Sequence, residues 1–314
     1  MTAAACPFVF NQFAGLTELP LPCDPNPLPG TSKRFPLSIR RASLKEAPST
    51  LRRIRKQPAY DLGHGVLIDP DNISLYVSYA GDEVVVDCPD GLEAYAAGWV
   101  IHAGAALSTL FTGGLPLHCA GAVLDRHYFG LLARAGTGKS TTLWALLGHG
   151  ALFANDDLIS VRLDGAMPIA YPSVSLYPKL HRTALERDGL DEAHYQVAPP
   201  NDDKFWVPIP AVARTVTPQS LSAVFVLEPT QTGDSEVHVV RSTVEAAAQT
   251  LSQSLHGLWL VQKYVSHAPI NALCRTLAET VPLYTLRYRK TFDILPRLVD
   301  AIRATLNHRI TRES

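Results

Sequence analysis

A glycine-rich stretch near the middle of the chain contains the residue types that bind phosphate groups. Residues 133–141 read Ala-Arg-Ala-Gly-Thr-Gly-Lys-Ser-Thr, which fits the pattern G-x-x-x-x-G-K-[ST] except that Ala133 replaces the first glycine. Glycines such as Gly136 and Gly138 let a backbone approach an anion closely, and free N–H groups at the start of the next helix bind it. We therefore expect a phosphate-binding loop.

The context and the individual residues of this loop predict a site for ATP and Mg²⁺. An apolar, strand-like run at 128–132 precedes the loop, and a run with helical spacing at 142–147 follows it. We expect Lys139 to reach the β- and γ-phosphates and the Ser140 hydroxyl to ligate Mg²⁺. The complete set of expected nucleotide contacts is Gly136, Thr137, Gly138, Lys139, Ser140 and Thr141.

Two adjacent carboxylates, Asp156 and Asp157, follow a short buried strand expected at 151–154. Because ligands of open α/β sheets bind at the carboxyl ends of the strands, we expect the loop and these aspartates to converge. One carboxylate would then orient and deprotonate an incoming hydroxyl, while the other binds Mg²⁺ directly or through water. The alternative interpretation is an ordinary Asp-Asp turn in which Asp157 caps a local element.

His118 is a further candidate catalytic residue, because it lies on an apolar strand expected at 117–124, just before the strand of the loop. If the two strands pair, His118 lies beside the phosphate site; the alternative is a buried core histidine. Several cations are candidates for contacts with phosphate or substrate, although single surface cations are usually solvated. Those cations are Lys179, His181, Arg182 and Lys204, the last flanked by acidic and aromatic residues.

Three of these motifs together resemble the catalytic domain of HPr kinase/phosphorylase. They are Leu-His-Cys-Ala-Gly-Ala-Val at 117–123, Gly-Thr-Gly-Lys-Ser at 136–140 and Ala-Asn-Asp-Asp at 154–157. In that family a histidine, a phosphate loop and an Asp-Asp pair occur in this order and at similar spacing. The resemblance implies a fold similar to bacterial phosphoenolpyruvate carboxykinase and Mg·ATP-dependent phosphorylation of a protein serine. It also implies that Asp156 is the base and Asp157 the acid on the Mg²⁺ side.

The family's later glycine-rich signature, which it uses with its phosphorylase activity, is absent from this sequence. That absence argues against dephosphorylating activity and against HPr as the substrate. The overall plan resembles the HPr-kinase-like proteins encoded with lasso-peptide genes, which phosphorylate a C-terminal serine of a precursor peptide; the stretch 171–180 adds to this resemblance. The related kinases commonly assemble, so the resemblance also suggests a homo-oligomer.

The pattern of elements predicts an α/β fold, with a kinase core built around the phosphate loop and a small β-rich N-terminal domain. We expect a proline-rich arm at 1–35, a β-rich domain with one apolar helix at 36–112, and an ATP-binding catalytic domain at 113–308. Within them, strands are expected at 65–68, 74–78 and 83–87, and helices at 92–110, 243–260, 268–279 and 292–306. Residues 166–210 are expected to be irregular apart from a helix near 180–188.

Composition limits the partners and the compartment. The chain has 314 residues, 46% of them hydrophobic and 18% charged, with a formal net charge of −1, which predicts a folded core and no general affinity for nucleic acid. The apolar stretch 92–111 contains Glu93 and His102, which favours a buried helix over a membrane span. Five cysteines without paired spacing indicate reduced thiols and a cytoplasmic protein.

Together these features predict an Mg·ATP-dependent kinase that phosphorylates a serine hydroxyl of a peptide or small protein. Two alternatives stay open. The same loop would serve a small-molecule kinase, and it would also serve a nucleotide-dependent regulatory protein in which transfer is weak or lost.

Overall fold

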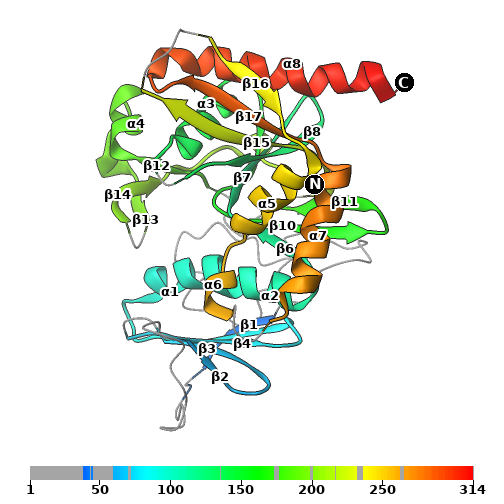
Figure 1. Ribbon diagram of the computed structural model, residues 1–314. Coiled ribbons are helices and arrows are strands. Elements are labelled where there is room, and N and C mark those ends of the chain that lie inside the picture. Colours follow the sequence, from blue (N-terminus) through cyan, green and yellow to red (C-terminus); the bar gives the residue numbers. More distant parts are fainter. Residues whose placement is uncertain are drawn as a thin grey trace.

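The computed structural model shows a mixed α/β fold with two main sheets and one helix run between them (Figure 1). It describes residues 38–42, 44, 59–69, 72–134, 136–172, 177–198, 201–215, 217–231, 236–261 and 265–313. The predicted proline-rich arm at 1–35 lies outside the described residues. The same is true of residues 173–176 within the stretch 171–180.

The N-terminal sheet has five strands within the described residues, in the order β1-β5-β4-β3-β2. Four of them form an antiparallel meander, in which β3, β4 and β5 confirm the three strands predicted from alternating apolar residues, whereas β2 was not predicted. The first strand pairs parallel with β5 and was not predicted. The bounds are β1 Ser38–Arg41, β2 Ala59–Asp61, β3 Gly65–Ile68, β4 Ser74–Ser78 and β5 Glu83–Asp87.

The predicted apolar helix consists of α1 (Glu93–Trp99), a π-helical segment (Val100–Gly104, called the π segment below) and α2 (Ala105–Phe111). Its apolar side chains share one core with the N-terminal sheet. Leu110 also packs against the core of the larger sheet. Because the helix run contacts both sheets, the domain boundary at residues 112 and 113 stays a prediction. Every helix in the described part of the chain is too short or too polar to cross a lipid bilayer.

A second sheet contains nine strands of the described chain, in the order β6-β10-β11-β15-β8-β7-β9, with β17 paired to β15 and β16 paired to β17. Its centre is parallel, since β15 pairs parallel with both β8 and β17. The bounds are β6 Leu115–Leu117, β7 Cys119–Leu124, β8 His127–Leu132, β9 Leu152–Asn155, β10 Ile159–Asp164, β11 Met167–Tyr171, β15 Gln219–Thr230, β16 His238–Arg241 and β17 Leu283–Arg289.

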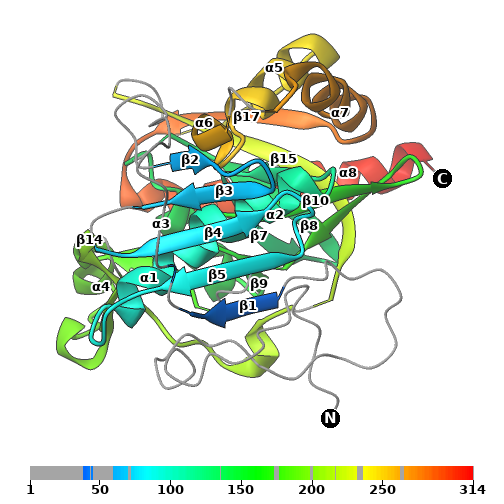
Figure 2. The ribbon, with the colours of Figure 1, turned by 90° about the horizontal axis from the view of Figure 1, so that it is seen from below.

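Two pairs of helices cover this sheet, and each pair belongs to a separate apolar core (Figures 1 and 2). On one face lie α3 (Lys139–Gly148) and α8 (Leu295–Glu313), and on the other lie α5 (Val244–Gln253) and α7 (His267–Thr280). The short helix α6 (Leu258–Val261) packs against the helix run of the N-terminal part. All four of the larger helices were anticipated from helical spacing.

The expectation of irregular structure at 166–210 was wrong for most of that region. It contains β11 and a three-stranded sheet, in the order β12-β14-β13, which packs against α4. Prolines misled the prediction because Pro178 and Pro208 lie just outside strands, where a missing N–H costs nothing. The bounds are β12 Lys179–His181, α4 Arg182–Arg187, β13 Gln196–Ala198 and β14 Asn201–Trp206, with 3₁₀ turns at Glu192–His194, Ala211–Ala213 and Phe292–Ile294.

Candidate functional site

Three predicted motifs meet at one edge of the larger sheet because of how its strands pair. Both β8 and β9 run antiparallel to β7, one on each side of it. The two therefore run in the same direction and end beside the start of β7. The glycine-rich loop follows β8, Asp156 and Asp157 follow β9, and His118 immediately precedes β7. This topology explains how residues up to 39 positions apart in sequence reach a single site.

His118 differs from the prediction in one respect, since it does not lie on a strand. The expected strand at 117–124 is broken there: β6 pairs with β10, whereas β7 pairs with β8 and β9. The backbone N–H of His118 donates instead to the carbonyl of Ser254, at 2.7 Å. The break leaves the His118 side chain about half exposed, at 48%, so it lines a pocket and is not a core residue.

The glycine-rich loop has the backbone geometry of an anion cradle. Gly136 and Gly138 adopt φ angles of 75° and 96°, a left-handed region that glycine enters without strain. A Cβ placed on Gly136 would meet nothing within 4 Å, so the loop opens onto free space. Helix α3 starts at Lys139, and its first N–H groups face the same space as the loop.

Two side chains at the end of β17, Tyr288 and Lys290, hold this loop from outside. The Tyr288 hydroxyl donates to the carbonyl of Thr137 at 3.2 Å, and Lys290 Nζ donates to the carbonyl of Gly136 at 2.7 Å. These bonds occupy carbonyl groups of the loop and none of its N–H groups. Within the loop, the N–H of Thr137 donates to the carbonyl of Arg134 at 3.2 Å. Nothing in the sequence pattern marked Tyr288 or Lys290 as part of the site.

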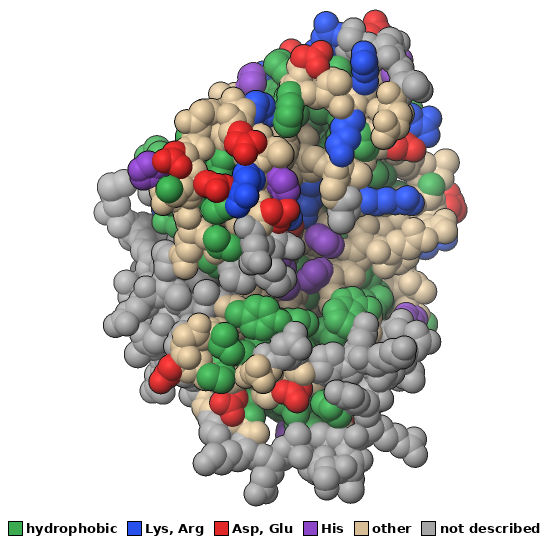
Figure 3. Space-filling view, turned by 90° about the vertical axis from the view of Figure 1, so that its left-hand side faces the viewer, with side chains coloured by type: hydrophobic (Ala, Val, Ile, Leu, Met, Phe, Trp, Pro, Cys, Tyr) green, Lys and Arg blue, Asp and Glu red, His purple; other side chains and the backbone are tan. Residues whose placement is uncertain are grey.

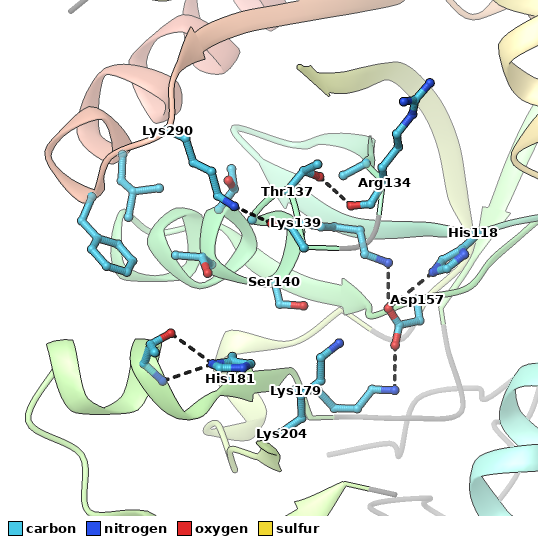
Figure 4. A pocket seen from close by; sticks show the side chains of 18 of the residues that line it. His118, Arg134, Thr137, Lys139, Ser140, Asp157, Lys179, His181, Lys204 and Lys290 are labelled. Carbon is cyan, nitrogen blue, oxygen red and sulfur yellow. Dashed lines mark hydrogen bonds and ion pairs between the residues drawn. The ribbon is translucent and has the colours of Figure 1, made fainter. Parts of the chain in front are cut away.

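A carboxylate that is only 13% exposed lies between two lysines directly below the loop (Figure 4). Asp157 Oδ1 is 2.7 Å from Lys139 Nζ, and its Oδ2 is 2.7 Å from Lys179 Nζ. Burial alone would raise the pKa of Asp157, but the two ammonium groups outweigh it and hold that pKa well below its usual range. Asp157 also adopts a φ of 69°, an uncommon backbone conformation that aspartate tolerates and that occurs at functional sites.

Asp156 occupies a different environment, although it is the adjacent residue. It is 1% exposed, and its Oδ2 accepts a hydrogen bond of 2.7 Å from the backbone N–H of Lys179. Its Oδ1 is buried without a hydrogen-bond partner among the described residues. Burial, followed by the charge of Asp157, raises the pKa of Asp156. Asp156 therefore anchors β12 from below, whereas Asp157 faces the pocket; the sequence interpretation had given the acceptor side to Asp156.

Three histidines form a cluster at the end of the site away from α8. The ring of His256 lies 4.9 Å from that of His118 and 5.4 Å from that of His102. His118 Nε2 is 3.8 Å from Asp157 Oδ1, and His102 Nε2 is 3.1 Å from Lys179 Nζ. Burial, with Lys179 second, brings the pKa of His102 well below its usual range. Burial, with His118 second, lowers the pKa of His256 to about 4.

His102 and His256 were missed as site residues by the sequence prediction. Each comes from a segment read as part of a helix, and neither belongs to a recognisable motif. The one available signal was that His102 is an ionisable residue within an otherwise apolar stretch.

These groups line one pocket of about 680 Å³ (Figure 4), which we call the main pocket. The predicted residues Lys179 and Lys204 line it, as does His181, which also bonds Asp203 at 2.7 Å. Arg182 does not; it pairs with Glu192 at 2.6 Å instead. The sequence-predicted residues that do line the main pocket are His118, Gly136, Thr137, Gly138, Lys139, Ser140, Thr141, Asp157, Lys179, His181 and Lys204.

The residues present fit a nucleotide and Mg²⁺. The open cradle at Gly136 suits phosphate, and the pocket volume lies in the range of small-molecule sites. No group of three or more metal-binding side chains occurs within the described residues. Mg²⁺ does not need one, because it takes one or two protein oxygens together with phosphate and water; Ser140 and Asp157 would supply them.

Comparisons with known proteins find weak structural similarity and no match in sequence. No family model matches the sequence, and no curated protein matches it. Among solved structures, the HPr(Ser) kinase/phosphatase from Coxiella burnetii is similar to this chain, with 12% sequence identity and a TM-score of 0.36. The similarity covers 63% of this chain and 99% of that chain. We base the proposed function on the geometry of the site.

Proposed function

We propose that this chain is an Mg·ATP-dependent kinase that phosphorylates a serine hydroxyl of a peptide or small protein. The observation that carries the proposal is the Lys139–Asp157–Lys179 arrangement beneath the glycine-rich loop. It places two fixed cations and one ionised carboxylate beside a phosphate cradle. Phosphoryl transfer needs these groups, because its catalysis consists mainly of positioning and charge stabilisation.

The nucleotide would occupy the side of the main pocket formed by the glycine-rich loop and the start of α3. When bound, Mg·ATP supplies the γ-phosphoryl group and part of the charge neutralisation. Burial alone would lower the pKa of Lys139, but Asp157 and Asp156 outweigh it and raise that pKa, so Lys139 stays charged. Phosphate oxygens would then compete with Asp157 for both lysines and free its carboxylate oxygens.

We assign the acceptor side to Asp157 and not to Asp156. Asp157 lines the main pocket, whereas Asp156 is held beneath β12 by the backbone of Lys179. In the reaction, the serine O–H would give its proton to the Asp157 oxygen that does not bind Mg²⁺, and the serine oxygen would bond to the γ-phosphorus. The bond from that phosphorus to the β–γ bridging oxygen would break, and ADP would leave. His118, 3.8 Å from Asp157 Oδ1, would position that carboxylate and line the acceptor's path.

The acceptor would enter from the histidine side of the main pocket, because the phosphate cradle occupies the other end, which α3 and residues 288–295 line. The sequence resemblance suggests a short precursor peptide of the lasso type as the acceptor. We expect no nucleic-acid or membrane partner.

The direct test uses the full-length chain with Mg²⁺, [γ-³²P]ATP and a mixture of peptides that each contain one serine. We expect acid-stable, alkali-labile label on peptide, as phosphoserine gives. The test variant is Lys139→Ala, which removes the buried cation. Its matched control is Lys290→Ala, which removes an exposed cation at the rim of the main pocket. Label on a metabolite alone would favour a small-molecule kinase. ATP binding seen as a thermal shift, without any transfer, would contradict the proposal and favour a regulatory nucleotide-binding protein.

A further inference from the structure

We propose that a second, aromatic pocket beside the histidine cluster binds an apolar side chain of the acceptor peptide, near its serine. This inference rests on the proposed function, because it specifies the acceptor of that same site. The second pocket, called the aromatic pocket below, has a volume of about 200 Å³. Its lining residues are Tyr95, Gly98, Trp99, His102, Ala103, His256, Gly257, Trp259 and Leu260.

The two pockets share a wall. His102 and His256 line both the main pocket and the aromatic pocket. A substrate that lies over the histidine cluster can therefore contact both pockets. Figure 3 shows hydrophobic side chains gathered beneath histidine side chains on the face that it presents. This continuity distinguishes the aromatic pocket from an unrelated surface hollow.

The lining chemistry selects an apolar or aromatic partner. Apart from the two histidines, every lining residue is apolar, aromatic or glycine, and none carries a charge. Trp259 is 40% exposed, which is unusual for so large an apolar side chain. Tryptophan and tyrosine at such positions commonly dominate binding energy, because they supply a large rigid surface.

The size indicates one side chain and not a separate ligand. At about 200 Å³ the aromatic pocket is smaller than the roughly 300–1,000 Å³ of typical small-molecule sites. The main pocket already has the size and the cradle for the nucleotide. The remaining candidate is a part of the second substrate, held beside the transferable phosphoryl group.

His102 adds an independent observation at the shared wall. Its Nε2 faces Lys179 at 3.1 Å, while its Nδ1 is buried and has no hydrogen-bond partner among the described residues. A buried ring nitrogen without a partner is costly. A backbone or hydroxyl group of a peptide that crosses this wall would satisfy Nδ1. The π segment that carries His102 is a rare distortion, and such distortions occur frequently at functional sites.

The first test is a positional peptide library offered to the full-length chain with Mg·ATP. Each peptide has one serine, and one flanking position at a time is fixed as Trp, Phe, Leu, Gly, Lys or Glu. We expect one position near the serine to favour Trp, Phe or Leu over Gly by about tenfold or more in kcat/KM, as for a side chain that fills an apolar pocket. In Trp259→Ala this preference should fall toward unity, and Trp259→Phe should restore much of it.

Met167→Ala is the matched control, because Met167 is also exposed, at 55%, but lies on β11 away from both pockets. It should keep the full preference. Transfer without any apolar preference, or a preference unchanged in Trp259→Ala, would overturn the aromatic pocket while leaving the kinase proposal intact.

A second test does not depend on transfer. The chain has four tryptophans, Trp99, Trp144, Trp206 and Trp259, so ¹⁵N-indole labelling gives four NMR signals. A serine peptide with a neighbouring Phe should shift the signals of Trp99 and Trp259 and leave Trp144 and Trp206 in place, whereas the Gly-matched peptide should shift none. Shifts without phosphorylation would support the pocket and sink the kinase function. An absence of selective shifts would overturn the pocket.

Discussion

The two ends of the main pocket are built in different ways. The nucleotide end is nearly continuous in sequence: a strand, a glycine-rich turn and a helix start, all between His127 and Gly148. The acceptor end combines segments far apart in the chain: the π segment, the break at His118, β12 and the turn before α6. The first end depends on backbone conformation, whereas the second depends on side chains that packing brings together.

This difference shows which kind of site a sequence reveals. A phosphate cradle needs particular residues at fixed spacing, because glycines and a helix start must be adjacent. An acceptor surface needs only that suitable side chains meet in space, so its parts carry no local pattern. The predictions below test this division, beginning with the change expected to have the largest effect.

Among the substitutions considered, Lys139→Ala should impair the function of the nucleotide end most strongly. We expect transfer to fall by about 10³-fold or more, because a preorganised cation is lost from the reacting phosphate. The thermal shift produced by ATP should weaken as well. Lys290→Ala, which removes the rim lysine bonded to the carbonyl of Gly136, should cost about tenfold or less. Equal losses in the two variants would contradict the special role of the buried lysine.

Substitutions of the two adjacent aspartates test the place where the nucleotide end and the acceptor end of the main pocket meet. Asp157→Asn should lower kcat by about 10²- to 10³-fold, in the range measured for loss of a base. Asp156→Asn should keep most of the activity, since an amide oxygen can still accept from the N–H of Lys179, and should mainly lower the melting temperature. Steady-state rates of the two variants, measured together, decide between the assignments. The reverse order would restore the assignment that the family resemblance implied.

His118→Ala should affect the acceptor end alone. We expect kcat/KM for the peptide to fall by about 10- to 100-fold, while the ATP-induced thermal shift stays unchanged, because the histidine contacts Asp157 and not the loop. His118→Asn keeps a polar group there and should recover part of the loss. A weakened ATP response in His118→Ala would show that the two ends are not separable.

The smallest expected effect concerns the pH dependence of stability. Burial, with His118 second, lowers the pKa of His256 to about 4, against about 6.5 in the unfolded chain. Between these values the unfolded state binds more protons, so stability decreases as the pH falls from about 6.5 to about 4. Urea unfolding at pH 7.5 and pH 5 should show a loss on the order of 1–2 kcal/mol that His256→Gln reduces. An identical loss in both proteins would contradict the lowered pKa.

The sequence was sufficient for most of the central fold and for the nucleotide end. Alternating apolar residues located three of the four strands of the N-terminal meander, and helical spacing located α3, α5, α7 and α8. Prolines near Lys179 hid the three-stranded sheet, because a proline just outside a strand looks the same in sequence as one that prevents a strand.

The acceptor end was predicted only in part, because His118, Lys179 and Lys204 were candidates whereas His102 and His256 were not. The position of His118 depends on β6 and β7 pairing with different neighbours, which no local pattern records. The contrast between Asp156 and Asp157 also depends on tertiary structure, because the backbone of β12 covers the first carboxylate and leaves the second open. His256 belongs to the cluster because the turn before α6 packs against the helix run.

Because of the π segment, the orientation of α1 relative to α2 depends on the exact number of residues between them. A π turn is equivalent to one residue inserted into an α-helix, and each residue of an α-helix turns its successors by about 100°. Deleting one residue between Val100 and Gly104 would therefore rotate the face that carries Tyr95 and Trp99 relative to α2. Such a shortened chain should still respond to ATP in a thermal-shift assay but lose selectivity among peptides. Insertions or deletions in the π segment would therefore change which peptides are accepted and leave the phosphate loop unaltered.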